Sequence, residues 1–326
     1  MRRRDFITLL GGVAAAWPLA ARAQQPTMPV VGYLSAGLAG SSAPSLGVFR
    51  QSLNEAGYVE GRNVAIDYRF AEGKYDRLPV MAEELVRRQV AVIVPTSSAP
   101  ALAAKAATAN IPIVFTSTDD PIKLGLVASL ARPGGNATGV HFFLSDLGAK
   151  QLGLLWELVP TAARIGLLFN PDNANAQTVT REVAPAASAM AVAIDVVQAS
   201  DRSGIDAAFA TLLRNKADAL IVAADPFLFS RRLQLATLAT RHALPAIYPV
   251  REYAEVGGLI TYGTSLTEVY RQAGAYVGRI LRGAKPADLP VVQSSKFELV
   301  INAQTARTLG VKISDNLLSL ADEVIE

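Results

Sequence analysis

Hydroxyl and carboxylate side chains gather where the apolar, strand-like runs of this sequence end. Residues 113–115 (IVF) form such a run, which is followed at once by TSTDD at 116–120 and then by a proline. A second apolar run, residues 90–94, is followed after one proline by TSS at 96–98. Such side chains can donate and accept hydrogen bonds to a small polar molecule, and a carboxylate can pair with an amine. Their positions predict either tight turns or a binding site.

The stretch at 116–120 supports both interpretations at once. Asp120 precedes a proline, which disfavours a helical residue before it, so Asp120 is expected to hold a turn. The turn does not require the hydroxyls before it. Thr116, Ser117 and Thr118 are therefore predicted to face a ligand cleft. Asp119 is not among the first candidates.

The hydroxyls at 96–98 stand directly before a helix that is expected to begin near Ala99. One hydroxyl at such a place is explained by capping of the first helical N–H groups. The same N–H groups and the positive end of the helix dipole also form a site for a carboxylate. Because capping explains one hydroxyl more easily than three, Thr96, Ser97 and Ser98 are predicted to bind ligand, with capping as the alternative.

Asp225 follows another apolar run, residues 219–222. A lone carboxylate in this position often caps the next helix. Across a cleft from a carboxylate site, it is also placed to bind an α-ammonium group, and such a pair gains strength when it is sheltered from water. Ser35, which follows the run at 30–34, completes the polar candidates.

Several aromatic residues lie near the ends of the strand-like runs and could form a wall for a planar side chain. Most aromatic residues in such positions belong to the core. Tyr253 and Tyr262 are the leading ligand-binding candidates, and the others are Tyr33, Phe142, Phe143 and Phe227.

The composition excludes much of catalytic chemistry. The chain has no cysteine and two histidines, His141 and His242, so thiolate sites and histidine-rich metal centres are not expected. No nucleophile–histidine–acid set is recognisable, and GGNATG at 134–139 lacks the lysine of a phosphate-binding loop, so it is expected to be a turn. We therefore expect no enzyme, no metal and no cofactor.

The basic character of the chain, with a pI near 9.1, comes from its first residues. Residues 1–23 hold four of the 31 Lys and Arg and one of the 28 Asp and Glu, so the remainder carries 27 of each sign and no nucleic acid partner is expected. Three arginines, an apolar stretch and an A-x-A site at 21–23 indicate an export signal cleaved near Ala23. RRDFI at 3–7 favours twin-arginine export over general secretion, and the apolar stretch is too short to span a membrane, so a periplasmic location is expected.

Strand-like and helix-like patterns alternate after residue 30, as in parallel sheets that are covered on both faces. Strands are predicted at 30–34, 64–70, 90–94, 113–115, 165–169, 194–197, 219–222, 246–248 and 259–262, with helices between them, including 76–88, 99–108, 174–191, 204–215 and 227–242. These are too many strands for one modest sheet, and 134–139 divides the series. The fold class is therefore α/β, with two doubly wound parallel-sheet lobes. Ligands of such sheets bind beyond the carboxyl ends of the strands, where the polar candidates and Asn170 would meet.

Three stretches resemble the ABC-transporter substrate-binding protein family of TrpX-like receptors. They are FTSTDDPIKLGLVASLARPGGNATGV, LPAIYPVREYAEVGGLITYG and KPADLPVVQSSKFELVINAQTARTLGV, and the resemblance runs from about residue 30 to the C-terminus. It implies a type I periplasmic binding protein whose two lobes are joined by a three-strand hinge and close on their ligand. The N-terminal lobe would hold residues 29–142 and 264–290, and the C-terminal lobe 143–263 and 291–326. The hinge would lie near 140–141, 262–263 and 289–290.

The resemblance further implies a periplasmic solute-binding component of an ABC importer that delivers a small zwitterion, an amino acid and possibly an aromatic one, to a permease in the inner membrane. The same fold could instead pass its ligand state to a membrane sensor. An enzyme on a doubly wound sheet lacks the expected fingerprints, and a sugar-sensing transcription regulator is contradicted by the export signal. The sequence does not name the ligand.

Overall fold

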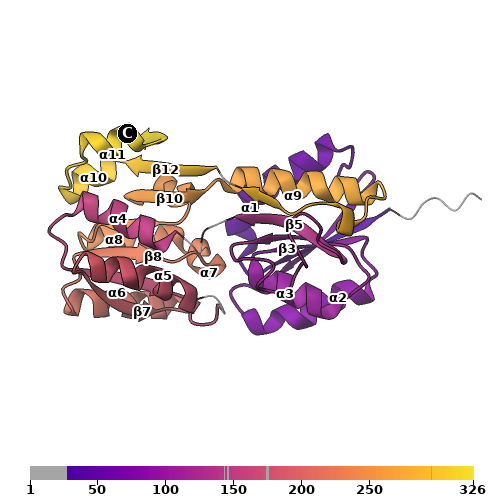
Figure 1. The fold of residues 1–326 in the computed structure, drawn as a ribbon, viewed down its shortest axis with the longest axis horizontal. Helices are drawn as coiled ribbons and strands as arrows, with labels where there is room; N and C mark the ends of the chain where they lie inside the picture. The colour runs from indigo at the N-terminus through magenta and orange to yellow at the C-terminus, as the bar shows by residue number, and fades with distance from the viewer. Residues whose placement is uncertain (1–27, 143, 145–146, 174–175, 295) are drawn as a thin grey trace, which may run out of the picture.

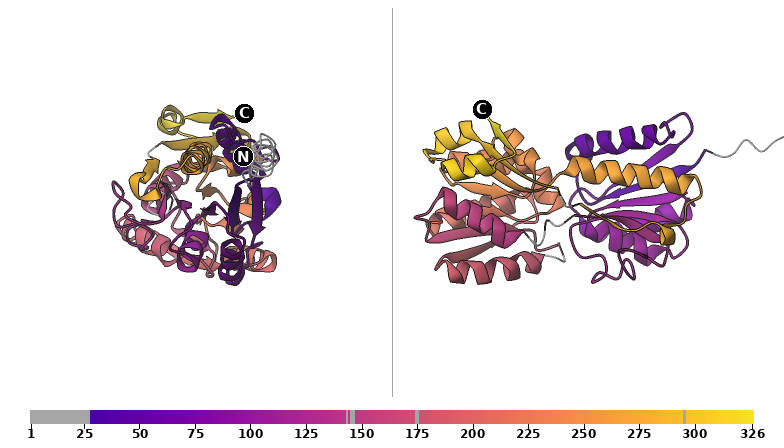
Figure 2. Two further views of the ribbon diagram at one scale, coloured as in Figure 1. Left: turned by 90° about the vertical axis from the view of Figure 1, so that its right-hand side faces the viewer. Right: turned by 45° about the horizontal axis from the view of Figure 1, so that its top comes forward.

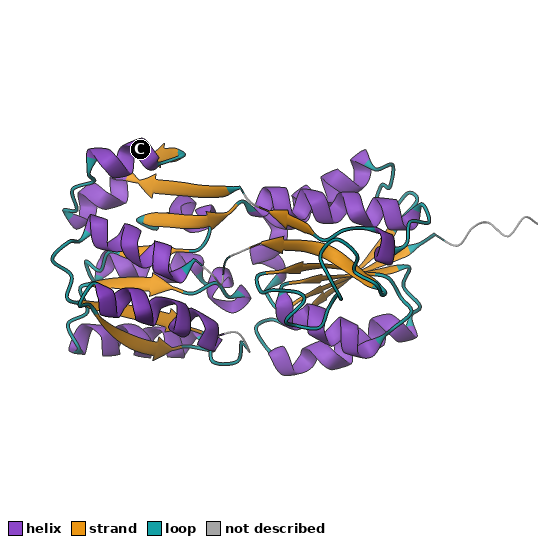
Figure 3. Ribbon diagram, viewed as in Figure 1, coloured by secondary structure: helices purple, strands orange, loops and turns teal. Residues whose placement is uncertain are grey.

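The computed structural model describes residues 28–142, 144, 147–173, 176–294 and 296–326. The expected export signal lies outside the described residues. Within these residues no helix is both long enough and apolar enough to cross a membrane. Two α/β lobes lie side by side, as Figures 1 and 2 show, and each is a sheet covered by helices on both faces (Figure 3). The predicted fold class is confirmed.

The N-terminal lobe contains a six-stranded sheet in the order β11-β5-β4-β3-β1-β2, and all its pairings are parallel. The strands are β1 (Val30–Ser35), β2 (Ala65–Phe70), β3 (Val92–Thr96), β4 (Ile113–Ser117), β5 (Ala137–Phe142) and β11 (Val292–Ser294). Helices α1 (Ala39–Glu55) and α9 (Leu266–Leu281) cover one face, and α2 (Leu78–Arg87) and α3 (Ser98–Ala107) the other. Because helices cover both faces, every residue of β3 and β4 is buried.

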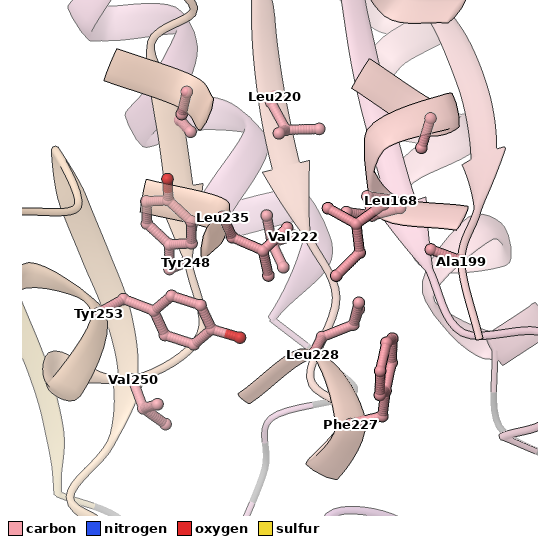
Figure 4. Packing of buried hydrophobic residues seen from close by; sticks show 14 of the residues in the cluster. Leu168, Ala199, Leu220, Val222, Phe227, Leu228, Leu235, Tyr248, Val250 and Tyr253 are labelled. Carbon is pink, nitrogen blue, oxygen red and sulfur yellow. The ribbon is translucent and has the colours of Figure 1, made fainter. Parts of the chain in front are cut away.

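The C-terminal lobe contains a seven-stranded sheet in the order β13-β12-β10-β9-β8-β6-β7, in which β10 and β12 are antiparallel. The strands are β6 (Arg164–Phe169), β7 (Ala193–Gln198), β8 (Ala219–Val222), β9 (Ala246–Tyr248), β10 (Ile260–Thr264), β12 (Phe297–Asn302) and β13 (Glu323–Ile325). Helices α4 (Gly148–Leu158), α5 (Ala176–Ala189) and α10 (Ala303–Leu309) pack on one face. Helices α6 (Arg202–Arg214), α7 (Pro226–Ser230) and α8 (Arg232–Arg241) pack on the other, around the cluster in Figure 4, and α11 (Asp315–Leu320) precedes β13.

The chain passes between the sheets three times, and each passage lies a few residues beyond its predicted place. It leaves the first sheet after β5, returns between β10 and α9 at Ser265, and leaves again between β11 and β12. The assignment of residues 291–294 to the C-terminal lobe is wrong, because β11 pairs with Val140, His141 and Phe142 of β5. Backbone hydrogen bonds to β5 extend the edge of the first sheet before the chain crosses.

Most of the predicted strands and helices lie within a few residues of their predicted bounds. The helix predicted at 227–242 is instead two helices, because the chain turns at Arg231, where the backbone leaves the helical region between α7 and α8. The elements α4, α9 to α11 and β11 to β13 were not predicted individually. The part of the chain that the structure describes also contains three short 3-10 helices: η1 (Tyr75–Arg77), η2 (Arg251–Val256) and η3 (Pro286–Asp288).

Gly263 in β10 permits the close approach of the loop after β9. A Cβ atom at this position would lie 1.7 Å from the Pro249 carbonyl oxygen, so no larger residue fits without moving the backbone. The approach matters because Pro249 and Val250, which follow β9, line the cavity between the lobes. A backbone contact near a lobe crossing thus positions part of the candidate site.

Candidate functional site

A cavity lies between the two lobes, at the carboxyl ends of their strands. Its lining comes from both lobes, and it has a hydroxyl-rich side and an apolar side. The hydroxyl residues of the N-terminal lobe are Ser35, Ser41, Ser42, Ser45, Thr96, Ser97, Ser98, Thr116 and Thr118. The mixed lining is typical of sites for small organic ligands.

The loop after β3 and the end of β4 are joined through backbone and side-chain contacts. Thr96 and Thr116 are partners in the parallel ladder, and the Ser97 N–H donates to Thr116 Oγ1 at 3.1 Å. Ser97 itself has a φ of +84°, which is a rare conformation for a residue with a Cβ atom. Such strain is found mainly at functional sites. It turns the chain so that α3 begins at the cavity.

Ser98 connects this loop to the stretch at 116–120. Its Oγ lies 3.0 Å from Ser117 Oγ and 3.3 Å from Thr118 Oγ1, and it donates to the Asp119 carboxylate. Thr118 Oγ1 also donates to Asp119, at 3.0 Å. Asp119 therefore orients two hydroxyls that line the cavity, although the sequence placed it behind the first candidates.

The prediction that Ser117 faces the cleft is wrong. Its side chain is fully buried, and its Oγ donates to the Asp119 carbonyl at 2.8 Å. Successive side chains along β4 point to opposite faces of the sheet, so the side chain of Ser117 points away from the cavity when that of Thr116 faces it. Asp120 holds the turn as expected, since its Oδ1 accepts from the Ile122 N–H at 2.9 Å.

Helix α1 also begins at the cavity, which the sequence analysis missed. Ser41 and Ser42 donate to the Leu38 carbonyl at 2.9 and 3.0 Å, and Ser45 lies one turn further along the lining. The available signal was the cluster of serines in SSAPS at 41–45, just after the end of β1. Two helix N-termini, those of α1 and α3, thus point their unpaired N–H groups and positive dipole ends at one place.

Asp225 lies on the opposite side of the cavity and is 7% exposed. Its Oδ1 accepts from the Leu228 N–H at 2.9 Å and from Asn170 at 3.3 Å, so it caps α7 as the structural interpretation expected. Its Oδ2 accepts from Asn173 at 3.0 Å and from the Tyr75 hydroxyl at 2.6 Å. Tyr75 belongs to the N-terminal lobe, so this hydrogen bond joins the two lobes.

The carboxylate of Asp225 is held by neutral donors. Burial raises the pKa of Asp225, and the hydrogen bonds from Tyr75, Leu228, Asn173 and Asn170 oppose this rise. No ion pair formed among the described residues includes Asp225. A buried negative charge without a cation is costly, so the site favours a positively charged group from a ligand.

The apolar side of the cavity contains aromatic and aliphatic side chains from both lobes. They are Phe142, Leu144, Phe229, Pro249, Val250 and Leu266, with Tyr75 and Tyr270 beside them. Phe229 is fixed from two sides. The Arg232 guanidinium lies 4.7 Å from its ring centroid, and the Tyr253 ring meets it edge to face at 6.1 Å. Such a wall suits an apolar, planar group.

The structure does not bring Tyr253 and Tyr262 to the cavity, so these two predictions are wrong. Tyr253 is fully buried and stacks on Tyr248 with ring centroids 4.6 Å apart. Tyr262 stacks on Phe297 at 6.0 Å and packs against the cores on both faces of its sheet. Tyr253 is thus a core residue, and Tyr262 is partly buried against the two cores of the C-terminal lobe.

Among the other aromatic candidates, Phe142 lines the cavity, and the ring of Phe227 lies where a Cβ atom added to Gly73 of the N-terminal lobe would meet it at 3.3 Å. Tyr33 is buried in the core, and Phe143 lies outside the described residues. The side-chain amide of Asn170 donates to Asp225, so Asn170 affects a ligand through that carboxylate. The cavity residues that the sequence analysis missed also include Tyr75 and Tyr270, which come from the 3-10 helix η1 and from α9 rather than from a strand end.

Known proteins resemble the chain along most of its length. Residues 42–325 match the family of ABC transporter substrate binding proteins. A tyrosine-binding protein of Clostridioides difficile is 28% identical over 264 residues, which cover 81% of this chain and 76% of that protein.

Two solved structures have similar folds. A conserved domain protein from Vibrio cholerae has a TM-score of 0.82 at 26% identity and covers 91% of this chain and 99% of its own. An ABC domain from Streptococcus pneumoniae in complex with L-Trp has a TM-score of 0.80, also at 26% identity and with the same coverage of both chains. With its two lobes, its cavity at the strand ends and a match over residues 42–325, the chain belongs to the ABC transporter substrate-binding protein family.

Proposed function

We propose that this chain is the periplasmic solute-binding component of an ABC importer and that it captures an aromatic amino acid between its lobes. The observation that carries the proposal is the pairing of two unlike walls in one cavity. Hydroxyls and two helix N-termini lie on one wall, and the buried carboxylate of Asp225 and an aromatic surface lie on the other. The protein acts by binding, and no catalytic step is needed.

The ligand's three parts match three parts of the lining. The carboxylate is bound by Ser98, Thr116 and the first N–H groups of α3 and α1. The ammonium pairs with Asp225, whose charge it compensates. The side chain packs against Phe229, Phe142 and Val250. The names of two relatives, which bind tyrosine or L-Trp, support an aromatic side chain.

Ligand contacts from both lobes stabilise the closed arrangement, since a ligand shifts an equilibrium toward the state that it binds better. The lobes meet at the Tyr75–Asp225 hydrogen bond, and Gly73 lies close to Phe227, whose ring would be 3.3 Å from a Cβ atom added there. A permease that binds the closed arrangement distinguishes the ligand-bound from the ligand-free protein by the relative position of the lobes. The export signal expected at residues 1–23 supports a periplasmic location for this exchange.

The test is isothermal titration of the chain without residues 1–23, refolded to remove carried-over ligand. L-Tryptophan, L-tyrosine and L-phenylalanine are compared with L-leucine, L-glutamate, a hexose and adenosine. Binding by one or more of the aromatic amino acids, at least about tenfold tighter than by the other compounds, supports the proposal. Binding of the hexose or adenosine alone contradicts it.

A further inference from the structure

We infer that the cavity selects its ligand by the amine and not by the carboxylate, so that decarboxylated aromatic amines belong to its ligand class. The inference rests on the proposed function, because it states which half of the bound zwitterion provides the affinity. It concerns the two walls of the cavity, which differ in how well their polar groups are paired in the absence of a ligand.

The first argument is the charge of the lining. Asp225 is the one formally charged side chain among the described residues that line the cavity, and these include no lysine and no arginine. A ligand carboxylate therefore meets neutral hydroxyls and backbone dipoles, whereas a ligand ammonium meets a full negative charge. The hydrogen bonds of both ligand groups have one charged partner at least, but only the ammonium and Asp225 add the Coulomb attraction between two full, opposite charges.

The second argument is that hydroxyl groups on the N-terminal wall already have hydrogen-bond partners within the protein. Ser35 Oγ accepts from the Gly37 N–H at 3.2 Å, and Thr116 Oγ1 accepts from the Ser97 N–H at 3.1 Å. Ser98 donates to Asp119. When a ligand lacks the carboxylate, these groups keep these hydrogen bonds within the protein. The loss of affinity is therefore small.

Asp225 is in the opposite situation. Four neutral donors surround its oxygens, but they do not cancel its charge, and the side chain is 7% exposed. A ligand without an amine encloses this charge without a cation and adds its own negative charge to the same cavity. Both effects weaken binding, and both are absent for an amine without a carboxylate.

The apolar wall does not distinguish the analogues. Phe229, Phe142 and Val250 contact the ring of the ligand, and that ring is the same in the amino acid, the amine and the acid. The affinities of an amino acid, an amine and an acid that share one ring therefore give the contribution of each polar wall separately.

The experiment measures dissociation constants by isothermal titration for two matched series. One is L-tyrosine, tyramine and 3-(4-hydroxyphenyl)propionate, and the other is L-tryptophan, tryptamine and indole-3-propionate. In the series whose amino acid binds better, we expect the amine within about tenfold of the amino acid and the acid at least about 100-fold weaker.

Two variants complete the design. Asp225→Asn keeps an oxygen for the Leu228 N–H but removes the charge, and it is expected to reduce the preference for amine over acid by at least about 30-fold. Asp201→Asn is the matched control. Asp201 also caps a helix, through the Gly204 N–H, but it lies outside the cavity, so the preference should not change.

The outcomes separate the inference from the proposed function. An acid that binds as tightly as the amine, or an unchanged preference in Asp225→Asn, overturns the inference and leaves the proposed function standing. An amine that binds where no amino acid binds supports the inference and overturns the proposed ligand. If none of the six compounds binds, both are overturned.

Discussion

The two walls of the cavity both contain buried polar groups, but these groups are paired in different ways. The N-terminal wall is lined by hydroxyls and helix ends. Ser98 and Thr118 donate to the Asp119 carboxylate, which is not itself part of the lining, and the Ser97 N–H donates to Thr116. The C-terminal wall has one carboxylate, Asp225, on an otherwise apolar surface. The first wall is complete without a ligand, and the second has a charge that lacks a cation. The comparison indicates that the C-terminal wall provides most of the discrimination between ligands.

A partly buried carboxylate in the C-terminal lobe, Glu252, shows the effect of burial on a group outside the cavity. Glu252 in η2 does not line the cavity, and its Oε2 has no hydrogen-bond partner among the described residues. Burial raises the pKa of Glu252 to about 7, and the neighbouring charge of Glu255 adds to this rise. Asp225 and Glu252 thus differ in one respect that matters: a ligand can reach only the first.

The largest expected effect is therefore on stability, at Glu252. A raised pKa means that the folded state binds more protons, so the stabilising contribution of neutral Glu252 is present at low pH and is lost as the pH rises through about 7. We expect Glu252→Gln to raise the free energy of unfolding by about 2 kcal/mol at pH 8 and to change it little at pH 4.5. Urea unfolding at both pH values measures this. Equal effects at both would contradict the assignment.

The next prediction concerns the pH dependence of ligand affinity. Because burial raises the pKa of Asp225, the ligand-free protein takes up a proton there as the pH falls, and an ammonium ligand must displace it. Below this pKa, the dissociation constant of an aromatic amine should rise by about tenfold per pH unit, while above it the constant stays level. Titrations between pH 7.5 and 4.5 test this.

Two variants serve as controls for this profile. Asp225→Asn should give a flat profile, whereas Glu252→Gln should keep the slope, because Glu252 does not line the cavity. A slope that persists in Asp225→Asn would assign the proton to another group and would break the comparison between the walls.

A smaller effect is expected at Tyr75, the residue that joins the two walls. Its hydroxyl donates to Asp225 across the cavity, so Tyr75→Phe removes one contact between the lobes and keeps the ring. The affinity for the ligand should fall by about fivefold, because one hydrogen bond to a charged group no longer favours the closed arrangement. Titration gives the affinity, and small-angle scattering of the ligand-free variant should show a larger radius of gyration. Tighter binding by the variant would show that Tyr75 competes with the ligand.

The smallest effect is expected at Tyr253, which the sequence placed in the site and the structure places in the core. Its hydroxyl is buried without a hydrogen-bond partner among the described residues, so Tyr253→Phe removes no such bond. The dissociation constant should stay within about twofold of that of the unmodified protein. A loss of more than tenfold would return Tyr253 to the ligand site.

Strand ends were the most reliable guide to the site in the sequence. Ser35, Thr96, Thr116 and Asp225 all line the cavity, because parallel strands bring their carboxyl ends to one edge whatever the details of packing. Ser117 was misplaced by a single residue along β4, where a step of one reverses the side chain's direction. Tyr75 and Tyr270 could not be found in this way, because they lie on the 3-10 helix η1 and on α9.

The sequence by itself determined the alternation of strands and helices, the two lobes, and the kind of residue at each strand end, because these depend on local patterns of apolar and polar residues. The tertiary structure alone decided which lobe each edge strand joins, which aromatic rings face the cavity, and that Tyr75 of one lobe reaches Asp225 of the other. These features depend on contacts between residues that are far apart in the chain, 150 positions in the case of Tyr75 and Asp225. No local pattern records such a contact, since it exists only once both lobes have folded and met.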